Sequence, residues 1–259
     1  MPIKIKDYTT TIFIFLSITT TMIILSSIEY SWDHWRRATC FPNKCFCEAL
    51  HSGTIVQPVN TWSNLAFIFI GLLVLHLGKQ DFLRRPFTNG MCNKRIYPLT
   101  YGGLLIFLGL SSSFYHASMT FVGQVFDLMG MYLLTTFILL YNIERLRPYK
   151  AWVFLLCYAF INIVLLYILL ILPQARRYIF ALLVIVALVP EYFLYKKKNA
   201  NNRLLFLAVG LLIIAFIVWI LDVKKIICAP HSFWQGHALW HVLTALSAGT
   251  LYLHYRSEV

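Results

Sequence analysis

Long uncharged apolar runs dominate the hydrophobic pattern of this 259-residue chain. Two of them, residues 151–172 and 204–221, contain no charged side chain. Each is about as long as a helix that crosses a bilayer, roughly 20 residues. Because the hydrocarbon region offers no water to the backbone, such runs must form helices that satisfy their own hydrogen bonds. The pattern therefore predicts an all-α fold, a polytopic membrane helix bundle.

The same pattern predicts one transmembrane domain over residues 1–259 with eight spans. A seven-helix core is expected over residues 61–255, preceded by a non-cytoplasmic segment over 29–60 and by one additional N-terminal helix. That first helix follows two lysines, as a signal peptide would, but its Thr-rich run is long and lacks a clear cleavage site. A retained anchor is therefore favoured. The expected spans are residues 10–28, 61–79, 97–116, 120–141, 151–172, 177–195, 203–221 and 235–255.

The composition of the chain supports its prediction as a membrane protein, and the location of its positive charge indicates what that charge does. Hydrophobic residues make up 59% of the chain and charged residues only 12%, about half the charged fraction of a typical soluble domain. The net charge of +12 lies in the loops between spans, so it indicates topology rather than binding to nucleic acid. Fifteen of the 22 lysines and arginines fall on one side of the alternating loops. Both termini are therefore expected to face the cytoplasm.

Four of the six cysteines fall on the predicted non-cytoplasmic side, where disulfides can persist: Cys40, Cys45, Cys47 and Cys228. A bridge between the 29–60 segment and the 222–234 loop is expected, with the pairing left open. The Cys-x-Cys spacing could instead suggest metal binding, but no further His or Cys at a suitable spacing supports that interpretation.

Three polar clusters interrupt the apolar helices, where an ionisable group costs about 2.5–3.5 kcal/mol on insertion scales. Ser112 and His116 lie four residues apart, on one face of the third predicted helix. Asp127 interrupts the fourth helix, and His237 and His241 repeat the four-residue spacing at the start of the last helix. All three clusters are expected at a similar depth near the non-cytoplasmic face. The sequence therefore predicts that they converge.

Three neutral imidazoles that leave a fourth position for water are typical of a catalytic zinc site. Zinc lowers the pKa of its bound water to ~7, so Asp127 would orient or deprotonate that water and Ser112 would donate a hydrogen bond as charge develops. Structural alternatives remain open, because paired histidines, Asp127 and Ser112 could each make ordinary hydrogen bonds within the helix bundle. The remaining histidines are expected at the surface: His34, His51, His76, His231 and His254.

At these residues the sequence resembles the alkaline ceramidase family, within the superfamily of seven-helix membrane hydrolases that includes adiponectin-receptor-like proteins. The resemblance covers about residues 45–255. It implies that His116, His237 and His241 bind zinc, with Asp127 and Ser112 beside the metal-bound water, and that ceramide is hydrolysed to a sphingoid base and a fatty acid. The similar elements are Ser112-x-x-x-His116, Asp127, His237-x-x-x-His241, Cys47-Glu48, Asn60-Thr-Trp-Ser-Asn64 and the run HALWHVLTALSAGTLY.

The resemblance also implies a calcium site around the Cys-Glu pair, as in animal members of the family, but this sequence makes calcium doubtful. Glu48 is present, whereas other residues stand where further ligands would fall: Cys45, Phe46, Leu50 and Gln57. Calcium takes six to eight oxygen ligands, and one carboxylate is a poor supply. Glu48 is instead expected to cap a helix or to pair with a nearby arginine.

The sequence thus predicts a zinc-dependent lipid amidase that takes a ceramide-like substrate laterally from the bilayer and cleaves it near the non-cytoplasmic face. An acyl ester hydrolase of the phospholipase type would use the same site. A non-enzymatic seven-helix receptor with structural zinc is a second alternative. A proton-coupled transporter is a third. It is disfavoured because the polar residues cluster at one end and leave the other half of the bundle almost purely apolar.

Overall fold

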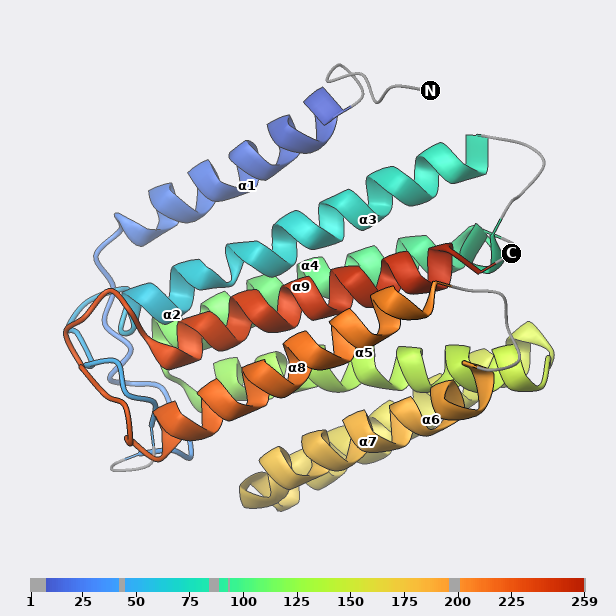
Figure 1. Cartoon of the computed structure of the whole chain (residues 1–259). Helices are drawn as coiled ribbons and strands as arrows, with labels where there is room; N and C mark the ends of the chain where they lie inside the picture. The colour runs from blue at the N-terminus through green and yellow to red at the C-terminus, as the bar shows by residue number, and fades with distance from the viewer. Residues whose placement is uncertain (1–7, 42–44, 84–88, 93, 196–200, 259) are drawn as a thin grey trace.

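The computed structural model is a bundle of long helices (Figure 1) and describes residues 8–41, 45–83, 89–92, 94–195 and 201–258. Within these ranges it contains helices and one isolated bridge but no strand, so the predicted all-α class is confirmed. The ends of the predicted domain, residues 1–7 and 259, lie outside the described residues. The helices are α1 (Thr9–Ser26), α2 (Pro58–Ser63), α3 (Leu65–Leu83), α4 (Ile96–Ser118), α5 (Phe121–Leu146), α6 (Ala151–Ile171), α7 (Arg176–Leu194), α8 (Asn202–Val223) and α9 (Gly236–Arg256), with 3-10 turns η2 (Gly90–Cys92) and η3 (Pro173–Ala175).

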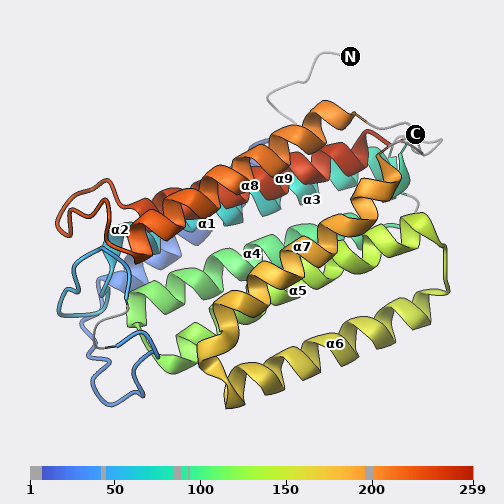
Figure 2. The same ribbon diagram turned by 60° about the horizontal axis from the view of Figure 1, so that its bottom comes forward.

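Seven of the described helices are long and apolar enough to cross a membrane, when α2 and α3 are taken as one span and η3 and α7 as another. This finding fits an integral membrane protein. α9 falls outside the group, although its 21 residues make it as long as the others. It carries histidine, serine and threonine among its apolar residues, and it packs between α3 and α8 in the same bundle (Figures 1 and 2). Together these helices match the eight predicted spans to within about five residues at each end.

The first helix of the predicted core begins earlier than expected and is interrupted. Pro58 stands at its start, where a missing backbone N–H costs nothing because the first helical amides have no partner within the helix. The helical backbone then breaks at Asn64, which separates α2 from α3. The break gives the chain a short helix, α2, that packs against both α4 and α9 at the end where the predicted site lies.

α1 lies at the edge of the bundle and touches it mainly through α3 (Figure 1). Most of its side chains are exposed, as expected for a helix that faces lipid. Tyr8, just before the helix, stacks on His76 of α3, and the Thr11 hydroxyl lies 3.2 Å from the same imidazole. His76 is therefore partly buried, whereas His34, His51 and His231 are exposed as predicted.

The end of the bundle where α5, α7 and α9 finish buries a group of charges that the sequence did not predict. Arg145 contacts the carboxylates of Glu191 and Glu258, and His254 Nε2 lies 2.8 Å from Glu191. We call these four residues the ion-pair cluster. His254 is fully buried, so its predicted surface position is wrong. The expectation that this half of the bundle is almost purely apolar is also wrong, because the ion-pair cluster lies in it. Nothing in the sequence indicated the cluster, since its members lie far apart along the chain and only the fold brings them together.

The opposite end carries residues 29–41 and 45–57 and the 224–235 loop (Figure 1). One of two disulfides at this end joins the segment to the loop. Cys40 pairs with Cys45, and Cys47 pairs with Cys228. The Ala49 amide also donates to the carbonyl of Pro230 at 2.9 Å. The expected bridge between segment and loop is confirmed, and its pairing is now defined.

Candidate metal centre and its cavity

Three histidines meet at the disulfide-bonded end of the bundle. His116 lies in the last two turns of α4, and His237 and His241 lie in the first two turns of α9. All three are buried, and one ligand atom from each can be chosen so that all lie within 4.8 Å of one another. We call these residues the histidine cluster. Of the three predicted clusters, the convergence of His116 with His237 and His241 is confirmed, and these residues could hold a metal ion.

The proton of His116 is fixed by Gln57, a residue of the loop before α2. Nδ1 of His116 lies 2.9 Å from Oε1 of Gln57. The amide nitrogen of Gln57 donates to the carbonyl of Glu48 at 3.1 Å, so its oxygen is the atom that faces the histidine and accepts a hydrogen bond. His116 therefore carries its proton on Nδ1, and the lone pair of Nε2 points into the histidine cluster.

Ser63 fixes the proton of His241 by the same logic. Its hydroxyl donates to the carbonyl of Asn60 at 2.9 Å, which uses its one hydrogen. The same oxygen lies 2.7 Å from Nδ1 of His241 and therefore accepts from it. His241 thus also presents an unprotonated Nε2. Hydrogen bonds of this kind orient metal-binding imidazoles in many proteins.

The spacing of one pair of histidines fits a small tetrahedral ion. Nε2 of His237 lies 3.2 Å from Nε2 of His116. Two nitrogens that bind one tetrahedral zinc at its usual bond length are roughly 3.3–3.4 Å apart. His237 differs from the other two, because its Nδ1 is buried with no hydrogen-bond partner among the described residues. Its ring is held by stacking on Phe46, at 3.6 Å between ring centroids. Three imidazole donors, with one nitrogen pair at this spacing, are compatible with a metal ion such as zinc.

Asp222, which the sequence analysis overlooked, attaches the start of α9 to the disulfide-bonded loop. Its two carboxylate oxygens accept from the backbone amides of His237 and Cys47, each at 3.0 Å. Gly236 allows this approach, since a Cβ at that position would lie 3.0 Å from Asp222 Cβ. Asp222 therefore positions His237 by its backbone.

Glu48 caps α2, which is one of the two roles expected from the sequence. Its carboxylate accepts from the amides of Val59 at 2.6 Å and Asn60 at 2.8 Å. Burial raises the pKa of Glu48 above its usual range, although these two amide bonds oppose the shift. Glu48 and Gln57 together hold the loop that orients His116.

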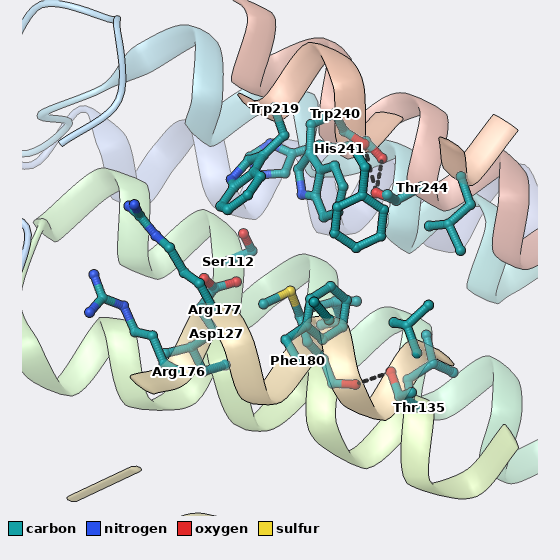
Figure 3. A pocket seen from close by; sticks show the side chains of 18 of the residues that line it. Ser112, Asp127, Thr135, Arg176, Arg177, Phe180, Trp219, Trp240, His241 and Thr244 are labelled. Atoms are coloured by element: carbon teal, nitrogen blue, oxygen red, sulfur yellow. Dashed lines mark hydrogen bonds between the residues drawn. The ribbon is translucent and has the colours of Figure 1, made fainter. Parts of the chain in front are cut away.

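Asp127 faces α4 from a side of α5 whose neighbouring residues are glycines. Gly123, Asp127 and Gly130 share this face, since they are four and three residues apart. A Cβ at Gly123 would lie 2.9 Å from the Tyr115 backbone, so only glycine lets the two helices pack this closely. Asp127 is thereby placed beside Ser112 (Figure 3). Both side chains point to the same space (Figure 3).

A cavity of about 770 Å³ begins at these residues and continues along the bundle (Figure 3). Ser112, Asp127, His237 and His241 line its polar end. It continues past aromatic and aliphatic side chains of α5, α7, α8 and α9 as far as Leu251. Leu251 lies fourteen positions after His237 in α9, a rise of about 21 Å. The cavity therefore has the length and lining needed for an acyl chain.

Two arginines that the sequence analysis assigned to topology also line this cavity. Arg176 and Arg177 begin α7 and lie beside Asp127 (Figure 3). Arg177 lies over the rings of Trp219 and Phe46, at 5.4 and 5.9 Å from the centroids. An arginine pair at the start of a span looks the same in sequence whether it marks a loop or lines a pocket, so no signal in the chain identified them.

Comparison with known proteins places the chain in a family. A family model described as Ceramidase matches residues 43–257. An alkaline ceramidase of Arabidopsis thaliana is 26% identical over 221 residues, which cover 83% of this chain and 82% of the relative. Alkaline ceramidase 1 of Mus musculus is 25% identical over 220 residues, covering 78% and 74% of the two chains. Since the family model spans most of its length, this chain belongs to the ceramidase family.

Proposed function

We propose that this protein is a zinc-dependent hydrolase that cleaves the amide of ceramide within the membrane and releases a sphingoid base and a fatty acid. One observation carries the proposal. Three buried imidazoles, two of them fixed with Nε2 lone pairs facing inward, meet at the polar end of a long apolar cavity. Membership of the ceramidase family supports the choice of an amide lipid as substrate.

The apolar part of the cavity would hold an acyl chain, which places the amide carbonyl beside the histidine cluster. Zinc held by His116, His237 and His241 would supply a Lewis acid that activates water at neutral pH. Asp127 would accept a proton from the attacking water and return it to the leaving amine nitrogen. Ser112 would donate a hydrogen bond to the oxygen on which negative charge develops.

We further propose that both termini face the cytoplasm and that the site lies near the non-cytoplasmic face. The unequal distribution of lysine and arginine supports this orientation. The two disulfides also support it, because they lie at the same end as the histidine cluster and disulfides persist in oxidising compartments.

Mass-spectrometric detection of products from purified protein in detergent tests the proposal. Ceramide and phospholipid would be offered to the wild type, to Asp127→Asn and to His237→Ala/His241→Ala, with His231→Ala as the control in an exposed loop. Sphingoid base and fatty acid should appear with the wild type and the control only. Release of fatty acid from phospholipid alone would instead identify an ester hydrolase. No product from either lipid with zinc still bound would favour a receptor with structural zinc.

A further inference from the structure

The polar end of the cavity carries more positive charge than its one carboxylate can balance. Arg176, Arg177 and Lys224 line it, and Asp127 is the single acidic residue among the described lining residues. Arg176 is only 6% exposed, yet it borders the cavity. Its Nη1 donates to the carbonyl of Pro173 at 2.7 Å, and within the described part of the chain no other protein group accepts from its remaining donors.

This arrangement is costly for the fold. Arg176 and Arg177 occupy the first two positions of α7, where the helix dipole is positive and disfavours cations. Charges at the ends of membrane helices are normally placed in water or paired with an opposite charge. In the described residues neither arginine forms an ion pair, in contrast to Arg145, which contacts two carboxylates. Arg177 is half-buried and lies over two aromatic rings, whereas Arg176 is buried, and among the described residues no carboxylate forms an ion pair with either of them.

Both guanidinium groups lie close to where the reaction would occur. In Figure 3 they lie on one side of Asp127, at the same end of the cavity as Ser112. Phe46 connects Arg177 to the histidine cluster, since the arginine lies over this ring while His237 stacks on it. An anion held by the arginines would therefore lie near the site of hydrolysis, with its chain in the cavity.

Hydrolysis of a neutral amide creates an anion at this place. The bond between the carbonyl carbon and nitrogen breaks, water supplies the new carbon–oxygen bond, and the nitrogen takes the proton, which leaves a fatty acid that ionises to a carboxylate. That product lies near the carboxylate of Asp127, in a region with little water, where like charges repel strongly. Guanidinium groups bind carboxylates through two parallel N–H donors and suit this task.

We propose that Arg176 and Arg177 form a binding site for the anionic head of a single-chain amphiphile, and that its occupant is the carboxylate of the released fatty acid. The identity of the occupant rests on the proposed function, whereas the anion site itself rests on the unpaired arginines and the cavity. The arginines would hold the carboxylate away from Asp127 as the product leaves.

Binding of oleate and of oleyl alcohol to the full purified chain in detergent tests this site, because the two ligands share a chain and differ in charge. The wild type should bind oleate about tenfold more tightly than the alcohol. Arg176→Gln/Arg177→Gln should lose this preference while it keeps the wild-type affinity for the alcohol, which also shows that the cavity is intact. Lys225→Gln removes an exposed charge at the same end and should retain the preference. Each comparison is made with and without EDTA, so that carboxylate binding by a metal is separated from binding by the arginines.

An unchanged preference for oleate in the double variant, or no preference in the wild type, would overturn the proposal. The anion could be the fatty acid product or the headgroup of a substrate. N-oleoylglycine distinguishes the two, since it carries its charge on a headgroup beyond the amide. If the double variant loses more affinity for oleate than for N-oleoylglycine, the occupant is the fatty acid product. If it loses more affinity for N-oleoylglycine, the occupant is an anionic headgroup of a substrate. Ceramide cleavage is measured on the same samples. Cleavage without an oleate preference defeats the anion site alone, and a preference without cleavage defeats the proposed function alone.

Discussion

Both ends of the helix bundle bury polar side chains, but they satisfy these side chains in different ways. In the ion-pair cluster, Arg145 contacts Glu191 and Glu258, and His254 contacts Glu191. At the other end, His116 and His241 turn unprotonated nitrogens into the histidine cluster, and Arg176 borders a cavity without an ion pair among the described residues. Every charged side chain of the ion-pair cluster has a partner within the fold, whereas the histidines and Arg176 keep ligand atoms or donors that no partner among the described residues uses.

This difference separates buried polar residues that stabilise the fold from buried polar residues that are available to bind a ligand. A buried charge whose partner is removed strongly destabilises the fold, so the ion-pair cluster is expected to determine stability. Open lone pairs and unpaired donors destabilise the fold when they are buried, so removing them does not cost stability, and they remain available for a ligand. Substitutions at the two ends should therefore affect different properties, activity at one end and stability at the other.

Asp127→Asn should give the largest effect at the site end. The amide keeps the size of the side chain but cannot accept the proton of water, so ceramide turnover should fall by about 10²–10⁴-fold. Zinc content and the unfolding temperature should stay at wild-type values, as measured by elemental analysis and thermal unfolding of the same preparation. Turnover within a few-fold of the wild type would show that Asp127 has only a structural role.

Arg145→Leu should give the largest effect at the opposite end. It leaves the carboxylates of Glu191 and Glu258 buried without their cation, and the free energy of unfolding should fall by about 3–5 kcal/mol. Arg147→Leu, at an exposed position two residues further along the chain, should change it by about 0.5 kcal/mol or less. Equal stabilities for the two variants, measured by denaturant unfolding in mixed micelles, would refute the structural role of the cluster.

Gln57→Leu should have an intermediate effect that is specific to the metal. It removes the acceptor that fixes the proton of His116, so zinc affinity should fall by about 10–100-fold in competition with a chelator. Gln124→Leu serves as the control, because Gln124 is equally buried and bonds Thr39 rather than a histidine. The role of Gln57 is excluded if both variants bind zinc alike.

Glu48→Gln should give the smallest effect, visible in the pH dependence of stability. Burial raises the pKa of Glu48 above its unfolded value near 4.5, so the folded state holds the proton more tightly than the unfolded state. Its contribution to stability is therefore fully present below the unfolded pKa and is lost as the pH rises through the folded pKa. The variant should lack this decline, while Glu29→Gln, at an exposed position, should keep it. Parallel stability–pH curves for wild type and Glu48→Gln would contradict this.

The helices and the histidine cluster could be predicted from the sequence because both depend on the spacing of residues close together in the chain. Uncharged runs mark the spans, and alternation of spans places His116 and the start of α9 at the same end. The break at Asn64 was missed, because residues 59–70 contain no glycine or proline to mark an interruption of the helix.

The remaining features depend on contacts between distant residues. Arg145 and Glu258 are separated by 113 positions, so no spacing rule connects them. Gln57 and Ser63 reach the histidines because α2 packs against α4 and α9, and Arg176 is distinguished from a loop residue only by the cavity it borders.

Metal content is the most direct test of whether the two ends differ as described. Elemental analysis would compare the wild type with His241→Ala and with His254→Ala, each purified in detergent as a monodisperse sample. We expect one zinc ion per chain in the wild type and in His254→Ala, and none in His241→Ala. Wild-type protein without metal, or a His241→Ala variant that keeps its zinc, would contradict the assignment of the histidine cluster as the metal centre.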